Sequence, residues 1–128
     1  MRSYGAAALG GALGALGRWA LGRGLPAGPG DWPLATLLVN LTGCLAIGVL
    51  VAVLPAGSGA RPWLRPFLVT GVLGGWTTWS AFAVDAVQLA EAGAWAVAAG
   101  YVVGSVAGGL LAVAAGLVGT RRALRARS

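Results

Sequence analysis

Charged residues are scarce in this chain, and their scarcity decides which solvent the protein meets. Only 9% of the 128 residues are charged, whereas 58% are hydrophobic. A surface that faces water normally carries about a quarter charged residues. A water-soluble globular fold is therefore excluded, and the composition indicates an integral membrane protein.

Histidine is absent, and cysteine occurs once, at Cys44. A disulfide framework within one chain and the usual zinc ligand sets are thereby excluded. The sequence also lacks a nucleophile beside a base, and no phosphate-binding glycine loop follows a strand. We therefore predict that the protein is not an enzyme and that Cys44 is a small buried residue.

Acidic residues are the scarcest charges, with three against nine arginines and a net charge of +6. In a soluble domain this balance would suggest a nucleic-acid partner. Here the arginines fall almost entirely between apolar stretches, where they set the orientation of membrane segments. We therefore predict contact with membrane lipid and none with nucleic acid.

Long apolar stretches dominate what is present. They cover residues 4–21, 32–54, 66–90 and 92–118, and a basic tail of residues 119–128 follows. Each is long enough to cross a hydrocarbon core of about 30 Å as a helix. A cleaved signal peptide is the alternative for the first stretch, but no polar mature start follows it. The chain thus reads as an all-α integral membrane protein, with four transmembrane helices in one domain spanning residues 1–128.

The arginines predict an orientation, because four crossings place both termini on one side of the membrane. That side collects Arg2, Arg61, Arg65, Arg121, Arg122, Arg125 and Arg127, and the other side has Arg18 and Arg23. Basic loops favour the cytoplasm, so both termini are predicted to be cytoplasmic. The basic tail can also attract anionic lipid, but a topology signal is the interpretation we favour.

Polar residues within the apolar stretches need a partner or a wet cavity. Thr36 and Asn40 lie four residues apart and share a helix face, and Tyr101 and Ser105 have the same spacing. For each residue alone, a hydrogen bond between helices is the simpler interpretation. Together the two pairs predict a polar stripe. The neighbouring small-residue ridge comprises Gly100, Gly104 and Gly108.

The third stretch contains a segment unsuited to a continuous helix. Its centre reads Gly74-Gly75-Trp76-Thr77-Thr78, and each glycine costs a helix about 1 kcal/mol relative to alanine. We therefore predict that the third helix is broken at Gly74–Thr78. A break frees backbone carbonyls in mid-membrane, where water, protein or an ion must satisfy them. Such carbonyls suit a hard monovalent cation such as Na⁺.

Several ordered motifs give the chain a close resemblance to one family, the Fluc/CrcB fluoride channels. The resemblance covers nearly the whole chain. The motifs are Gly10-Gly11 through Gly14-Ala15 to Arg18-Trp19, Thr36-Leu37-Leu38-Val39-Asn40 with Gly43, Gly74-Gly75-Trp76-Thr77-Thr78-Trp79-Ser80-Ala81-Phe82 with Asp85, and Tyr101 with Ser105. The resemblance implies a fluoride-selective channel of the cell membrane, through which fluoride leaves the cytoplasm passively.

The resemblance also implies an assembly and a set of site residues. Family members are antiparallel dimers with two pores and a structural Na⁺ at the dimer centre. By position, the main-chain carbonyls of Gly74 and Thr77 would hold this Na⁺. The implied pore residues are Thr36, Asn40, Trp79, Phe82, Tyr101 and Ser105, and Arg18 would supply positive potential at a vestibule. Amide and hydroxyl donors and positive ring edges are groups that can replace the water around fluoride.

The chain departs from the usual family pattern at three positions. Trp79 stands where Phe is usual, Ala81 where Thr is usual, and Asp85 where Glu is usual. We interpret Asp85 as structural, because a carboxylate beside the path would repel an anion. The strong arginine bias leaves two assemblies open, a homodimer and a heterodimer with a paralogue of opposite topology.

Two other functions compete with the channel. A small multidrug exporter needs a carboxylate in its first span, where this chain has only Arg18 as a charged residue. A non-conducting accessory subunit needs only packing glycines and a few interhelical hydrogen bonds, so the sequence leaves it open. Ion flux through the purified protein separates an accessory subunit from a channel.

Overall fold

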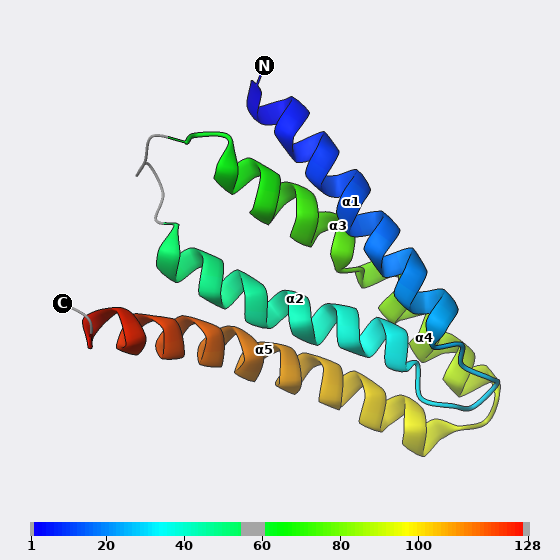
Figure 1. Ribbon diagram of the computed structural model, residues 1–128. Coiled ribbons are helices and arrows are strands. Elements are labelled where there is room, and N and C mark those ends of the chain that lie inside the picture. Colours follow the sequence, from blue (N-terminus) through cyan, green and yellow to red (C-terminus); the bar gives the residue numbers. More distant parts are fainter. Residues whose placement is uncertain (1, 55–60, 127–128) are drawn as a thin grey trace.

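The protein is a bundle of helices (Figure 1), in a computed structural model that describes residues 2–54 and 61–126. The elements are α1 (Arg2–Gly24), α2 (Leu34–Val53), the π-helix η1 (Pro66–Leu73), the short α3 (Gly74–Trp76), α4 (Trp79–Glu91) and α5 (Trp95–Arg125). No strand occurs in the described ranges. The predicted all-α class is confirmed.

Length and hydropathy identify three candidate membrane spans among the described residues. They are α2, the segment Pro66–Glu91 and α5. Helix α1 has 23 residues, but its glycines and its three arginines, Arg2, Arg18 and Arg23, lower its hydropathy. Three of the four predicted spans are therefore apolar enough to cross a membrane, and α1 forms the fourth long helix.

Helix α5 extends further than the apolar pattern indicated. It continues to Arg125, so most of the predicted basic tail is helical, while residues 127 and 128 lie outside the described part. Alanine, leucine and arginine are good helix formers, and no proline stops the helix after residue 118. At 1.5 Å per residue the helix is about 46 Å long, which exceeds a hydrocarbon core of about 30 Å.

Helix α1 packs along η1 and α3, and the three elements run in the same direction (Figure 1). A Cβ atom added to Gly14 would overlap the carbonyl oxygen of Val72, and one added to Gly75 would overlap that of Gly11. Only glycine allows two helix backbones to approach so closely. The close contact makes α1 a rigid support for the middle of the third span.

Helices α2 and α5 form the second parallel pair. Gly48 approaches the backbone of Val113, and Gly116 approaches that of Leu45. The predicted small-residue ridge lies beside this contact, since Gly104 faces open space. Its other two members meet only side chains, those of Trp32 at Gly100 and Leu41 at Gly108. Helix α5 has glycines on more than one of its faces. The face that contacts α2 is the one on which the two backbones can approach each other.

Between α3 and α4, the backbone leaves the helical conformation at two residues. Thr77 has φ −79° and ψ 160°, and Thr78 has φ −151° and ψ 120°. Gly74 is helical, with φ −63° and ψ −33°. Threonine is β-branched and tolerates extended backbone, and its hydroxyl can cap a helix. The Thr78 hydroxyl accepts a hydrogen bond from the Ala81 amide at 3.1 Å, which starts α4 as a new helix.

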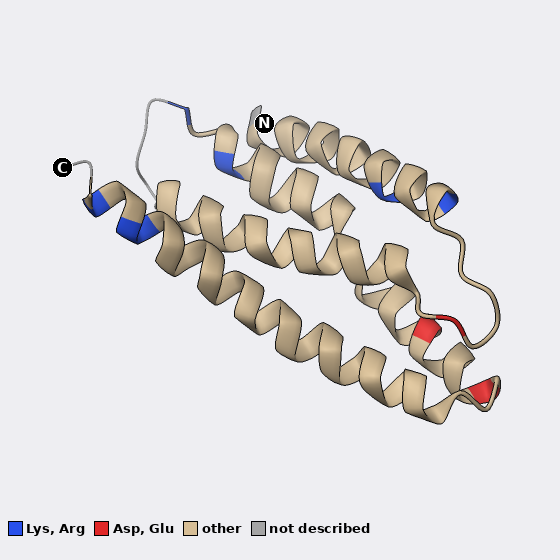
Figure 2. Cartoon of the chain, turned by 60° about the horizontal axis from the view of Figure 1, so that its bottom comes forward, with Lys and Arg blue, Asp and Glu red and all other residues tan. Residues whose placement is uncertain are grey.

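Charge is divided between the two ends of the bundle (Figure 2). Most arginines lie at the end that carries both termini, on the segment before η1 and on the last turns of α5, whereas Arg18 and Arg23 lie on the second half of α1. The acidic residues gather at the opposite end. They are Asp31, Asp85 and Glu91, and all three line one cavity of about 560 Å³.

Candidate functional site

A cavity of about 530 Å³ lies where α2, α5 and the segment from η1 to α4 meet. Its lining is mostly apolar, as is usual for a ligand pocket. The polar and aromatic residues that line it are Asn40, Thr77, Thr78, Trp79, Phe82 and Ser105, and Gly74 lines it as well. The tertiary structure thus brings both predicted sodium ligands together with four of the six predicted pore residues.

Asn40 joins α2 to the extended residues of the third span. Its Nδ2 donates to the Thr78 carbonyl at 3.0 Å, and its Oδ1 accepts from the Thr78 amide at 2.8 Å. One carboxamide therefore satisfies both backbone groups of a residue that lies outside any helix. The amide nitrogen carries a second hydrogen, which these two bonds leave available.

The hydrogen bonds of the amides around Thr78 determine whether the carbonyls of Gly74 and Thr77, the predicted sodium ligands, have a helical partner. In a continuous helix, the Thr78 amide would donate to the Gly74 carbonyl and the Ala81 amide to the Thr77 carbonyl. The Thr78 amide donates instead to Asn40, and the Ala81 amide donates to the Thr78 hydroxyl. The carbonyls of Gly74 and Thr77 are thereby released from their helical partners, which fits a cation held by main-chain oxygens. Within the described residues no three His, Cys, Asp or Glu side chains gather into a metal cluster.

Aromatic rings form a continuous series from the cavity to the end of the bundle. The ring centroids of Trp79 and Phe82 are 5.1 Å apart, and those of Phe82 and Tyr101 are 5.4 Å apart. Trp32 meets Tyr101 edge-on at 6.4 Å. Phe82 and Tyr101 are buried, whereas Trp79 is 76% exposed. The series holds Phe82 in place from two sides.

Ser105 contributes an unusual hydroxyl to the cavity. Its Oγ atom is buried and makes no hydrogen bond with any described residue. A buried polar atom without a partner costs stability, so such atoms are rare in folded proteins. The hydroxyl lines the cavity and has a hydrogen-bonding capacity that no described residue uses.

Two predicted pore residues lie away from the cavity lining. The Tyr101 hydroxyl donates to Asp85 Oδ2 at 3.2 Å, which gives Asp85 a structural partner. Thr36 lines the acidic cavity at the end of the bundle, together with Asp85. These residues therefore continue the polar stripe beyond the central cavity.

Arg18 is bonded to the third span. Its side chain is half-buried, and its Nε donates to the Gly75 carbonyl at 3.0 Å. The arginine does not line the central cavity. The structure thus places the predicted vestibule residue against the backbone just before the extended threonines.

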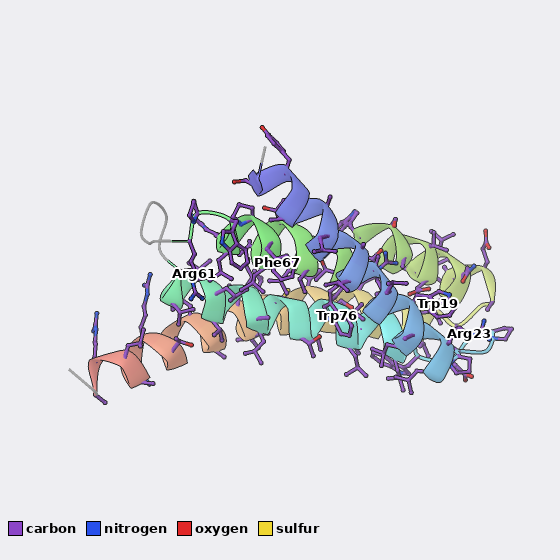
Figure 3. All side chains as sticks on the ribbon, turned by 45° about the horizontal axis from the view of Figure 1, so that its top comes forward. Trp19, Arg23, Arg61, Phe67 and Trp76 are labelled. Carbon is purple, nitrogen blue, oxygen red and sulfur yellow. The ribbon has the colours of Figure 1, made fainter. Side chains whose placement is uncertain are left out.

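Sequence reasoning missed the contact between Trp76 and Thr42. The Trp76 indole donates to the Thr42 hydroxyl at 2.9 Å, and its ring lies over Gly17 of α1. Figure 3 shows Trp76 between α1 and α2. An indole N–H within a membrane segment must find an acceptor, and this requirement is the signal that could have pointed to Thr42.

The fold and the cavity define a multi-pass membrane protein whose polar groups converge where the third span changes conformation. The family model described as "CrcB-like protein, Camphor Resistance (CrcB)" matches residues 5–117. The match covers most of the chain. The chain therefore belongs to the CrcB family, as the resemblance predicted.

Several relatives bear the name "Fluoride-specific ion channel FluC". One from Paracoccus denitrificans is 54% identical over 113 residues, which cover 86% of this chain and 87% of the relative. One from Stutzerimonas stutzeri is 49% identical and covers 88% and 91%. One from Chloroflexus aurantiacus is 44% identical and covers 88% and 90%. These are names of ion channels, which agrees with the prediction that the chain is not an enzyme.

Proposed function

We propose that the chain is a subunit of a fluoride-selective channel. The family and the names of its relatives supply the class and the ion. The observation that carries the proposal is the buried Ser105 hydroxyl, which has no partner among the described residues and lines the same cavity as Asn40. A hydroxyl and an amide in an apolar cavity offer donors to a small anion that sheds water.

The start of α4 adds a second favourable feature for an anion. The first amides of a helix have no partner within it, and the helix dipole is positive at this end. Trp79, the first residue of α4, lines the cavity beside Asn40. The Ala81 amide already donates to the Thr78 hydroxyl. In our proposal the amides of Trp79 and Ser80, the Asn40 amide and the ring of Phe82 attract fluoride in turn along the path.

The proposed Na⁺ has a structural role. The carbonyls of Gly74 and Thr77, released from their helical partners, would hold it at the dimer centre, and the extended backbone between α3 and α4 would act as a break in the spanning helix. A cation there would neutralise carbonyl dipoles that otherwise face a low-dielectric interior. Replacing Na⁺ by a large organic cation during purification should then lower the unfolding temperature of the assembled protein.

The proposed assembly is an antiparallel dimer, either of two copies or with a paralogue of opposite topology. Trp79 is 76% exposed in the single chain although it lines the cavity, so a partner is needed to complete the pore wall.

Helix α1 would be the fourth span of each subunit. The Arg23 guanidinium lies over the Trp19 ring, 5.5 Å from its centroid, and such a pair is typical of a membrane interface. Figure 3 shows both residues near the end of α1.

The arginine-rich end of the bundle (Figure 2) would face the cytoplasm in a chain that follows the positive-inside rule. Both termini would then be cytoplasmic. Fluoride would leave the cell passively through the plasma membrane, and no energy source is required. Arg127, which also supported this orientation, lies outside the described residues.

The experiment is fluoride efflux from liposomes that contain the purified protein, with chloride efflux as the control. Rapid fluoride loss without chloride loss supports the channel. Absence of flux from folded protein leaves two possibilities, a missing paralogue or an accessory subunit. Adding the paralogue of opposite topology decides between them, because only the heterodimer gains flux.

A further inference from the structure

The side chain of Arg18 binds a backbone group that the interruption of the third span has deprived of its partner. In a continuous helix the Gly75 carbonyl would accept from the Trp79 amide. The backbone is extended at the two threonines between them, so that bond is lost. The Nε of Arg18 donates to this carbonyl at 3.0 Å.

The contact is one of a series in which three side chains of α1 and α2 hydrogen-bond to residues between Gly75 and Thr78. Thr42 holds Trp76 through the indole, and Asn40 holds Thr78 through two bonds. Arg18 is the member of this series that comes from α1. Its position is defined, because α1 and Gly75 are in backbone contact through Gly11.

We propose that Arg18 is a positioning residue of the conduction site, and that it acts through its Nε–H bond to Gly75 and not through its charge. This inference rests on the proposed channel function. The Gly75 carbonyl belongs to the peptide between Gly75 and Trp76, and only the φ and ψ angles of Gly75 separate this peptide from the one that carries the Gly74 carbonyl. The bond from α1 thereby orients the proposed sodium ligand and the start of α4.

A matched series of substitutions separates the bond from the charge. Glutamine places its Nε2 the same number of bonds from Cα as the Nε of arginine, so Arg18→Gln keeps the donor and removes the charge. Arg18→Lys keeps the charge and moves the donor one bond outward. Arg18→Met removes both and keeps an unbranched chain. Arg23→Met is the control, because Arg23 contacts Trp19 on its own helix.

Fluoride efflux from liposomes is the first measurement. We expect Arg18→Gln to stay within about threefold of the parent protein and Arg18→Met to fall by at least about tenfold, which corresponds to losing one hydrogen bond. Arg23→Met should leave efflux unchanged. Equal loss in Arg18→Gln and Arg18→Met, with full activity in Arg18→Lys, would show that charge is what matters and would overturn the inference.

Amide hydrogen exchange over residues 76–80 is the second measurement, and it does not depend on conduction. Arg18→Met should exchange these amides faster, and Arg18→Gln should protect them as the parent protein does. If the parent protein passes no fluoride even after the paralogue is added, the channel proposal fails while exchange still tests the positioning role. Equal protection in Arg18→Met and the parent protein would overturn the positioning role whatever the flux.

Discussion

Asn40 holds Thr78 by two hydrogen bonds, at 3.0 Å to its carbonyl and 2.8 Å from its amide. The two bonds resemble those between neighbouring β-strands, except that the side-chain amide of Asn40 takes the place of the second backbone. It allows a residue with φ −151° to sit inside a helical bundle without leaving its backbone groups unsatisfied. One side chain of α2 therefore stabilises the extended backbone that divides α3 from α4.

Replacing Asn40 by aspartate should disturb that pairing. Asn40→Asp removes the donor to the Thr78 carbonyl and places a carboxylate oxygen beside that carbonyl oxygen, where the two repel each other. We expect the free energy of unfolding to fall by about 1–3 kcal/mol and fluoride efflux to fall by at least about tenfold. Liposome flux and thermal unfolding measure the two effects. Gln88→Glu makes the same chemical change at an exposed residue of α4 that lines the acidic cavity and not the central one. A similar loss there would show that added negative charge is the cause.

Ser105→Ala tests whether the unpaired hydroxyl serves conduction. The hydroxyl has no bond to lose among the described residues, so its removal should leave the free energy of unfolding unchanged or raise it by up to about 1 kcal/mol. Fluoride efflux should nevertheless fall, because a donor on the path is gone. Ser80→Ala, at an exposed serine near Thr78, is the control. A variant with lower stability and normal flux would contradict the assigned role.

Phe82→Ile tests the aromatic ring in the cavity. The substitution keeps an apolar residue between Trp79 and Tyr101 but removes the ring edge that can face an anion. We expect a large loss of fluoride efflux with the protein still folded as a helical bundle. Phe67→Ile is the same change at the other phenylalanine, which contacts Trp63 and lies outside the cavity. Figure 3 shows Phe67 near the start of the third span, away from Trp76. Equal loss of flux in the two variants would argue against a specific role for Phe82.

Gly48 and Gly104 form a pair that tests the helix contact between α2 and α5. A Cβ atom at position 48 would overlap the backbone of Val113, whereas position 104 has open space. Gly48→Ala should lower the free energy of unfolding by about 1–3 kcal/mol. Gly104→Ala should leave it unchanged or raise it by up to about 1 kcal/mol, because alanine is the better helix former. Denaturation of the purified protein in detergent measures both. If Gly104→Ala destabilises more than Gly48→Ala, the predicted ridge at Gly100, Gly104 and Gly108 is the true contact after all, or a partner subunit packs on it.

The helices could be predicted from the sequence because a long apolar run is sufficient to indicate each of them. An apolar run of about 20 residues in a membrane must satisfy its own backbone, and a helix does so. Their ends were predicted less well. Helix α5 continues through Arg121 and Arg122 to Arg125, since hydropathy marks the edge of the membrane while backbone propensity decides where a helix stops.

The candidate site could be predicted in part. Polar residues in apolar runs marked Asn40 and Ser105, and the glycine and threonine content marked the middle of the third span. The hydrogen-bond partners of these residues could not be predicted from the sequence, because Asn40 and Thr78 lie 38 residues apart and Arg18 and Gly75 lie 57 residues apart. The extended backbone also falls on the threonines and not on the glycines, since α1 holds Gly75 in helical contact.

Composition alone determined that this protein belongs in a membrane, and ordered motifs alone determined its family. Both properties are local, because transfer into lipid depends on residue type and a motif depends on order along the chain. Tertiary structure alone decided which bonds those residues make. It paired the Asn40 side chain with the backbone of Thr78, placed the Arg18 Nε against the Gly75 carbonyl, and left the buried Ser105 hydroxyl without a partner among the described residues. A hydrogen bond depends on distance and direction between atoms, and these exist only once the four long helices have packed.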